Sequence, residues 1–194
     1  VASIHLVGLS SLLGSINFIS TILIEKNHSV ETTIYVHSLL STSFLLIVTV
    51  PFLAIAITGI LLDHCGTSIY DTLEAGKGDP IIYQHLFWYF GHPEVYIVIL
   101  PVFGLVSRIL TQSINLNPLN IDSLVASLHI IGSVSFIVYG HHMYTAGISL
   151  DSRIYFSSAT LIIGIPTSIK VVSWLHSICS TDMITLSGSL VYAT

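Results

Sequence analysis

The chain has 194 residues, of which 53% are hydrophobic and only 8% charged, with a net charge of −5 and a mean hydropathy of +0.88. Water-soluble domains carry about 25% charged residues, so this composition excludes an ordinary soluble domain and predicts an integral membrane protein. Five scattered basic residues give no nucleic-acid-binding signature. Cys65 and Cys179 lack CxxC spacing and predict no disulfide or cluster. The chain starts at Val1 without a signal-peptide pattern, and we expect it to be part of something longer or a processed product.

Long apolar segments predict five membrane-spanning helices, each of at least the roughly 20 residues that a bilayer crossing requires. In chain order they cover residues 4–24, 36–62, 81–110, 124–144 and 155–178, and a sixth begins near Met183. Strands are not expected, because the runs are much longer than the roughly 10 residues of barrel strands and lack alternation. The expected fold class is all-α: a polytopic transmembrane helix bundle forming a single membrane domain over residues 1–194.

The third segment contains the sequence Gly91-His92-Pro93-Glu94-Val95-Tyr96. At about 100° per residue, His92 and Tyr96 lie one turn apart on the same helical face, and Glu94 points elsewhere. Only two charged residues, Glu94 and Lys170, fall deep inside apolar runs. Ionisable groups there are costly and indicate functional sites.

The fourth segment ends in Tyr139-Gly140-His141-His142-Met143. Adjacent imidazoles are about 100° apart on an ideal helix, so both can bind one metal only if the backbone loosens, which Gly140 and Gly147 make easy. With His92 this gives three imidazoles, a set that suits copper or zinc and favours copper by intrinsic affinity. The alternative is that these histidines only pack between helices.

The fifth segment places Lys170 three residues after Thr167, on the same helical face. Ser107, eleven residues beyond Tyr96, returns to nearly the same face of its own segment, about 16 Å further along. A polar line of Ser107, Lys170, Thr167 and Tyr96 is therefore expected if the third and fifth segments pack together. The alternative for Lys170 is a lysine whose ammonium snorkels to the interface. His85 is a further, weaker candidate.

Four blocks of the sequence resemble subunit I of the haem–copper oxidases, the superfamily that includes cytochrome c oxidase. They are GDPIIYQHLFWYFGHPEVY from Gly78, HHMYT from His141, IPTSIKVVSW from Ile165 and SSLLGSINF from Ser10. The resemblance covers essentially the whole chain and implies spans four to eight, and the start of span nine, of a twelve-span fold. Departures from the family pattern are Ser168 for a glycine, Tyr139-Gly140 for a Trp-Ala pair, and a loop over 71–79 about two residues longer than usual.

The resemblance implies that His92, His141 and His142 are the ligands of CuB, the copper that faces the oxygen-binding haem a3. It implies that Tyr96 is a phenol cross-linked to His92. Trp88 and Val95 would pack near that haem.

The resemblance also implies two proton routes. Glu94 would end one of them, with Ser10, Ser11 and Asn17 lining its approach. The second route would run through Lys170, Thr167 and Ser107 to Tyr96.

The implied function is that of a terminal respiratory oxidase, which reduces O₂ to water with electrons from cytochrome c and pumps protons across the mitochondrial inner membrane. The family's haem-ligating histidines have no counterpart here, so we expect the chain to act only with a partner that supplies them and with the other subunits, including the copper-A subunit. Haem a also belongs to the complete subunit. The alternatives are a non-catalytic remnant that fills its place in the complex, a quinol-oxidising relative, and a bacterial plasma membrane as the location.

Overall fold

The computed structural model describes residues 1–24, 33–72, 78–114 and 120–179. Of these residues, 86% are helical and none is in a strand, which confirms the predicted all-α class. The elements are α1 (Ala2–Ile24), α2 (Ile34–His64), α3 (Pro80–Ile114), α4 (Ile121–Ser135), the 3₁₀ helix η1 (Tyr139–Met143) and α5 (Leu150–Cys179). The sixth predicted segment, near Met183, lies outside the described residues.

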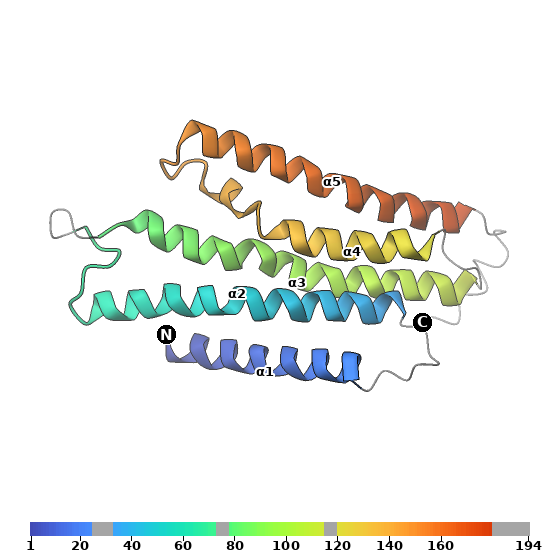
Figure 1. The fold of residues 1–194 in the computed structure, drawn as a ribbon, viewed down its shortest axis with the longest axis horizontal. Coiled ribbons are helices and arrows are strands. Elements are labelled where there is room, and N and C mark those ends of the chain that lie inside the picture. The colour runs from blue at the N-terminus through green and yellow to red at the C-terminus, as the bar shows by residue number, and fades with distance from the viewer. Residues whose placement is uncertain (25–32, 73–77, 115–119, 180–194) are drawn as a thin grey trace.

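The helices lie side by side in an elongated bundle in which sequence neighbours run antiparallel (Figure 1). Helix α2 packs between α1 and α3, and α4 packs between α3 and α5 (Figure 1). A buried cluster joins α2, α3 and α4 and includes Leu45, Leu100, Leu124, Leu128 and Ile131. This apolar contact holds α2, α3 and α4 together.

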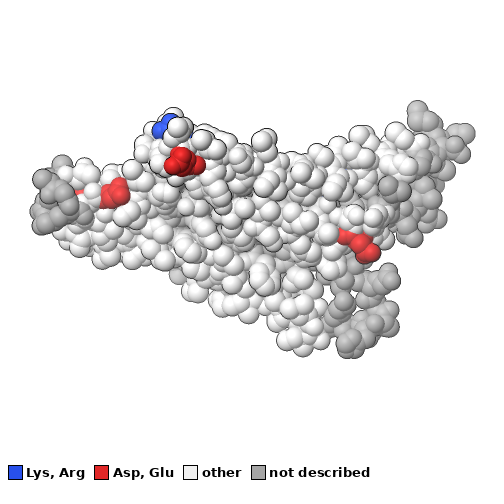
Figure 2. Space-filling model, turned by 45° about the horizontal axis from the view of Figure 1, so that its top comes forward, with Lys and Arg blue, Asp and Glu red and all other residues white. Residues whose placement is uncertain are grey.

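Four helical segments are long and apolar enough to cross a membrane: Ala2–Ile24, Ile34–His64, Pro80–Gln112 and Leu150–Cys179. Their outward faces expose large apolar side chains, for example Leu6, Leu150 and Leu161 at 68%, 70% and 78%. Figure 2 shows one face of the molecule with only isolated charged groups. A surface of this kind is stable in lipid but not in water.

The fourth predicted span, 124–144, is not one continuous helix. Helix α4 ends at Ser135, and after a short turn the chain forms η1 over Tyr139–Met143. At Gly140 a Cβ would collide with the ring of Phe156 on α5, so the close approach of η1 to α5 requires glycine. Gly147, with φ +83°, continues the turn towards α5. The α-helix is therefore interrupted at the two histidines, and the backbone there winds into a tighter 3₁₀ turn instead of the expected loosening.

The turn after α2 is organised by the carboxylate of Asp63. It accepts hydrogen bonds from the backbone N–H groups of Ile69, Tyr70 and Asp71 at 2.6, 2.8 and 3.1 Å. The Tyr70 ring then lies against Gly59, where any side chain would collide with it. Burial raises the pKa of the Tyr70 phenol, so the group stays neutral. This turn fixes the end of α2 beside the start of α3.

Candidate metal centre

Three histidines from two elements converge at one point in the bundle. His92 is a buried residue of α3, and His141 and His142 come from η1; one ligand atom of each lies within 4.8 Å of the others. The closest pair is His92 Nδ1 and His142 Nε2, 3.2 Å apart. The rings of both adjacent histidines lie close to that of His92, with centroids 4.7 Å away for His141 and 5.4 Å away for His142. The structure brings the three predicted histidines together, and their role as ligands stays a prediction.

The hydrogen bonds around His141 leave one of its ring nitrogens available for a metal. Its Nδ1 lies 3.3 Å from Thr160 Oγ1 on α5, and that hydroxyl donates its own proton to the Phe156 carbonyl at 2.7 Å. Thr160 Oγ1 must therefore accept from Nδ1–H, which leaves the lone pair on Nε2. Metal-binding histidines typically donate their other ring N–H to an oxygen atom in this way. No pattern in the sequence singled out Thr160.

Trp88 lies directly against the cluster. Its ring stacks on that of His142 with centroids 4.2 Å apart and planes 7° apart. This contact, which sequence reasoning missed, fixes the orientation of His142. Val95 is 55% exposed and faces away from the described helices; the packing of both residues near a haem stays a prediction.

Tyr96 lies one turn after His92, as predicted, with ring centroids 4.8 Å apart. The phenol ring packs between the two apolar clusters of the bundle. Among the buried side-chain polar atoms of the described residues, His92 Nε2 alone has no hydrogen-bond partner. A buried nitrogen without a partner is costly, and this one belongs to the ring that Tyr96 contacts.

A second histidine of α3 supports η1 from the other side. His85 Nδ1 lies 3.2 Å from the hydroxyl of Tyr139, and the Tyr139 ring packs edge-on against Phe156 and Tyr89. His85 thus contacts the turn that carries the two adjacent histidines. Its place outside the cluster agrees with its ranking as a weaker candidate.

Glu94 points away from the histidines, as the helical spacing predicts. It lines a cavity of about 390 Å³ between α1, α2 and α3, together with Ser11. Of the three first-segment residues expected on its approach, Ser11 is the one that lines this cavity. The backbone carbonyl of Asn17 accepts from the hydroxyl of Ser20. Two hydroxyl groups of α1, those of Ser3 and Ser11, therefore line the cavity that Glu94 borders.

Lys170 is fully buried, with 0% exposure, and its Nζ donates to the Leu124 carbonyl of α4 at 3.0 Å. Within the described bundle this position does not fit a snorkelling lysine, because the ammonium reaches inward. Nearby, Ser107 accepts from Trp174 Nε1 at 2.9 Å and donates to the Phe103 carbonyl. The third and fifth predicted helices do meet, but Ser107 contacts α5 through Trp174 and not through Lys170.

Thr167 completes the predicted polar line. Its hydroxyl donates to the Ile163 carbonyl within α5 at 3.0 Å. None of the hydrogen bonds found among the described residues links Thr167, Lys170 and Ser107 to one another, so a proton route through them would need intervening water. The sequence placed these groups on suitable faces but could not specify their partners.

Comparisons with known proteins agree with this architecture. The family model described as "Cytochrome C and Quinol oxidase polypeptide I" matches residues 1–193. The chain is similar to proteins named cytochrome c oxidase subunit 1 from Candida albicans, 41% identical over 187 residues, and from Mytilus edulis, 43% identical over 189 residues. These alignments cover 94% and 93% of this chain but 35% and 33% of the relatives, so the chain spans about a third of their length. The chain belongs to the family of polypeptide I of the cytochrome c and quinol oxidases.

Proposed function

We propose that the chain forms the copper-binding part of the catalytic subunit of a cytochrome c oxidase in the mitochondrial inner membrane. The observation that carries the proposal is the convergence of His92, His141 and His142 at the junction of α3 and η1. The relatives named cytochrome c oxidase subunit 1 from Candida albicans and Mytilus edulis support the choice of oxidase and of compartment. The complete reaction would be reduction of O₂ to water, coupled to proton pumping.

The donor set fits a copper ion. Three neutral imidazoles leave one coordination position open for a reactant, a set that copper accepts. His92 Nδ1 and His142 Nε2 face each other, and Thr160 holds the tautomer that offers His141 Nε2. Copper bound there would supply a redox-active centre beside the oxygen-binding haem.

Tyr96 would supply a proton and an electron when the O–O bond breaks. A covalent bond between His92 Nε2 and the phenol ring would explain why that buried nitrogen has no hydrogen-bond partner. It would also prevent Nε2 from carrying a proton and so direct Nδ1 to the metal. The one-turn spacing and the ring separation of 4.8 Å support this link.

The two charged residues deep inside apolar runs, Glu94 and Lys170, would hold protons on separate sides of α3. Glu94 would hold a proton at the cavity that it shares with Ser11, on the α1 side. Lys170 would hold a proton at Nζ against the Leu124 carbonyl, on the α4 side. Thr167 and Ser107 would bind the water that joins Lys170 to Tyr96. Ionisable groups within membrane segments are characteristic of proton relays.

The haem ligands would come from residues outside this sequence. The partners proposed are therefore the polypeptide that carries those histidines, the copper-A subunit that receives electrons from cytochrome c, and the lipid bilayer. The chain would take the place of spans four to eight, and the start of span nine, of the family's twelve.

The test is the His141→Ala variant in the assembled complex. Removing one of three ligands should lower bound copper below half of the wild-type content and abolish O₂ reduction, while the complex still assembles. The control is His5→Ala, because His5 bonds to Thr58 between α1 and α2, away from the cluster. Full copper content with normal turnover in His141→Ala would refute the proposal.

A further inference from the structure

Three side chains on one face of α3 contact the turn that carries the two adjacent histidines. His85, Trp88 and His92 are spaced i, i+3 and i+7, so they share a face over about 10 Å of the helix. His85 meets the first residue of η1, Tyr139. Trp88 and His92 meet its fourth residue, His142. The proposed function gives His92 a role as a ligand and assigns none to His85.

The contact between His85 and Tyr139 is a hydrogen bond that joins α3 to η1. His85 Nδ1 and the Tyr139 hydroxyl oxygen are 3.2 Å apart, and the two rings meet at 74° with centroids 5.9 Å apart. Both side chains are half-buried. A polar group that is withdrawn from water destabilises the fold if it has no partner. The bond therefore favours the position of η1 at which these two groups meet.

Aromatic contacts restrict the Tyr139 ring on its other sides. The ring lies edge-on against Tyr89 of α3, with centroids 5.4 Å apart, and against Phe156 of α5, with centroids 5.3 Å apart. The same Phe156 ring fills the space beside Gly140. Because Tyr139 is held between α3 and α5, a shift of its ring requires a shift of the η1 backbone.

The backbone of η1 carries the position of Tyr139 on to the two histidines. They follow two and three residues later, which is about 4–6 Å along a 3₁₀ helix. The turn has only five residues, and 3₁₀ hydrogen bonds have poorer geometry than those of an α-helix. His142 is exposed in the described chain, so the placement of the turn, together with the stack on Trp88, decides where its ring lies.

We infer that His85 is a positioning residue for the copper centre. Through its hydrogen bond to Tyr139 it sets where η1 lies along α3, and therefore how far the two histidines of η1 stand from His92. His85 itself lies outside the three-histidine cluster. The inference rests on the proposed function, since copper is the ion whose binding the bond supports.

The experiment is a chelator titration of copper in the purified assembled complex, comparing the wild type with His85→Leu, Tyr139→Phe and the double variant. We expect each single variant to bind copper about 3- to 10-fold more weakly, the factor to which one neutral hydrogen bond corresponds. The double variant should be no weaker than the single variants, because all three lack the same bond. Wild-type affinity in both single variants, or losses that add in the double variant, would overturn the inference.

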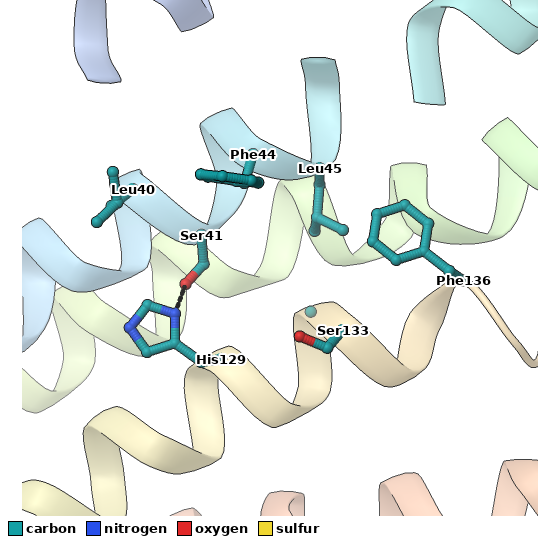
Figure 3. Close-up of a pocket in the computed structure, with 8 residues that line it drawn as sticks. Leu40, Ser41, Phe44, Leu45, His129, Ser133 and Phe136 are labelled. Carbon is teal, nitrogen blue, oxygen red and sulfur yellow. Dashed lines mark hydrogen bonds between the residues drawn. The ribbon is translucent and has the colours of Figure 1, made fainter. Parts of the chain in front are cut away.

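Two further variants separate the bond from general effects of losing a histidine. His85→Asn keeps a hydrogen-bonding atom near the place of Nδ1 and should bind copper like the wild type. The matched control is His129→Leu, because His129 Nδ1 also bonds to a hydroxyl across two helices, Ser41 Oγ at 2.9 Å, away from η1 (Figure 3). Losses in His85→Asn or in His129→Leu as large as in His85→Leu would overturn the inference.

A second measurement needs no copper and is independent of the proposed function. It is hydrogen–deuterium exchange of the copper-stripped complex, read on peptides that contain the backbone N–H groups of His141 and Ala146, which donate to the Val138 and Met143 carbonyls. His85→Leu and Tyr139→Phe should exchange faster there than the wild type and His129→Leu. Unchanged exchange would overturn the inference whatever the copper content. A wild-type complex without copper would refute the proposed function, while faster exchange in the variants would still support His85 as the residue that positions η1.

Discussion

Thr160 shows how a single hydroxyl can prepare a histidine for a metal. It donates to the Phe156 carbonyl and accepts from His141 Nδ1–H, so the lone pair of His141 is held on Nε2. Trp88 acts on the neighbouring ligand by stacking on His142. Both contacts restrict how the imidazoles rotate, and a metal ion then binds without first having to order them.

Replacing Thr160 tests this role at the residue scale. Thr160→Val keeps the shape but removes the acceptor for His141 Nδ1–H. We expect copper affinity to fall by about 10-fold or more, as it does when a metal-binding histidine loses its hydrogen-bond partner. The measurement is copper retention in the purified complex during a chelator titration. Thr160→Ser, which keeps the hydroxyl, should retain copper like the wild type; equal loss in both variants, or in neither, would contradict the role.

At the scale of elements, the approach of α3 to α2 depends on Gly104. A Cβ at Gly104 would lie 2.8 Å from the Cβ of Ser38 and 3.0 Å from the Cα of Tyr35, both on α2. Small residues that allow close helix contact are the usual basis of packing in membranes, where apolar burial against lipid contributes little. His92 lies on the same helix, about three turns before Gly104, so this contact bears on where α3 presents it.

Gly104→Ala should therefore push α3 away from α2. Overpacking of this kind costs about 1–3 kcal/mol, and we expect a lower thermal unfolding temperature and less copper in the purified complex. Gly14→Ala is the matched control, because a Cβ at Gly14 on α1 meets nothing within 4 Å among the described residues. An unchanged unfolding temperature in Gly104→Ala would show that the two helices can separate without cost.

Helix α4 and η1 show where an element departs from its pattern. The hydropathy of residues 124–144 predicts one span, yet the α-helix stops at Ser135 and a 3₁₀ turn follows. Hydropathy reports that a segment is apolar and does not report its winding. The tighter turn is favoured by contacts from other elements, Phe156 against Gly140 and His85 against Tyr139.

At the scale of the whole molecule, the outward faces of the described helices are apolar. Large apolar side chains cover the outer faces of α1 and α5. In the described chain, residues of two elements, α3 and η1, form the histidine cluster. Membrane helices with such faces are stable against lipid or against further helices. The proposed function places the polypeptide with the haem ligands beside this cluster.

Purifying the assembly through an affinity tag on this chain tests that arrangement. We expect haem and copper together in the purified material, with the haem-ligating polypeptide retained in detergent at high salt, because contacts within the membrane are apolar. The measurements are optical haem spectra, elemental copper and mass spectrometry of the components. Copper without haem, or neither, would show that this chain does not form part of an oxidase centre.

The sequence by itself determined the class of protein, the helices and the identity of the candidate site. Low charge and long apolar runs require a membrane bundle, because only helices and closed barrels satisfy every backbone hydrogen bond in lipid. Helical periodicity placed His92 and Tyr96 on one face and Glu94 on another, and the structure agrees. These properties are local, since each depends on residues within a few turns of one another.

Only the tertiary structure decided which groups meet. It paired Thr160 with His141, Trp88 with His142, Lys170 with the Leu124 carbonyl and His37 with His129. It also placed Ser107 against Trp174, although periodicity alone was compatible with a direct contact to Lys170. Such contacts depend on the rotation and depth of each helix against its neighbours. The rotation and depth of a helix are set by close approaches such as that of Gly104 on α3 to α2, and no pattern within a single segment specifies these approaches.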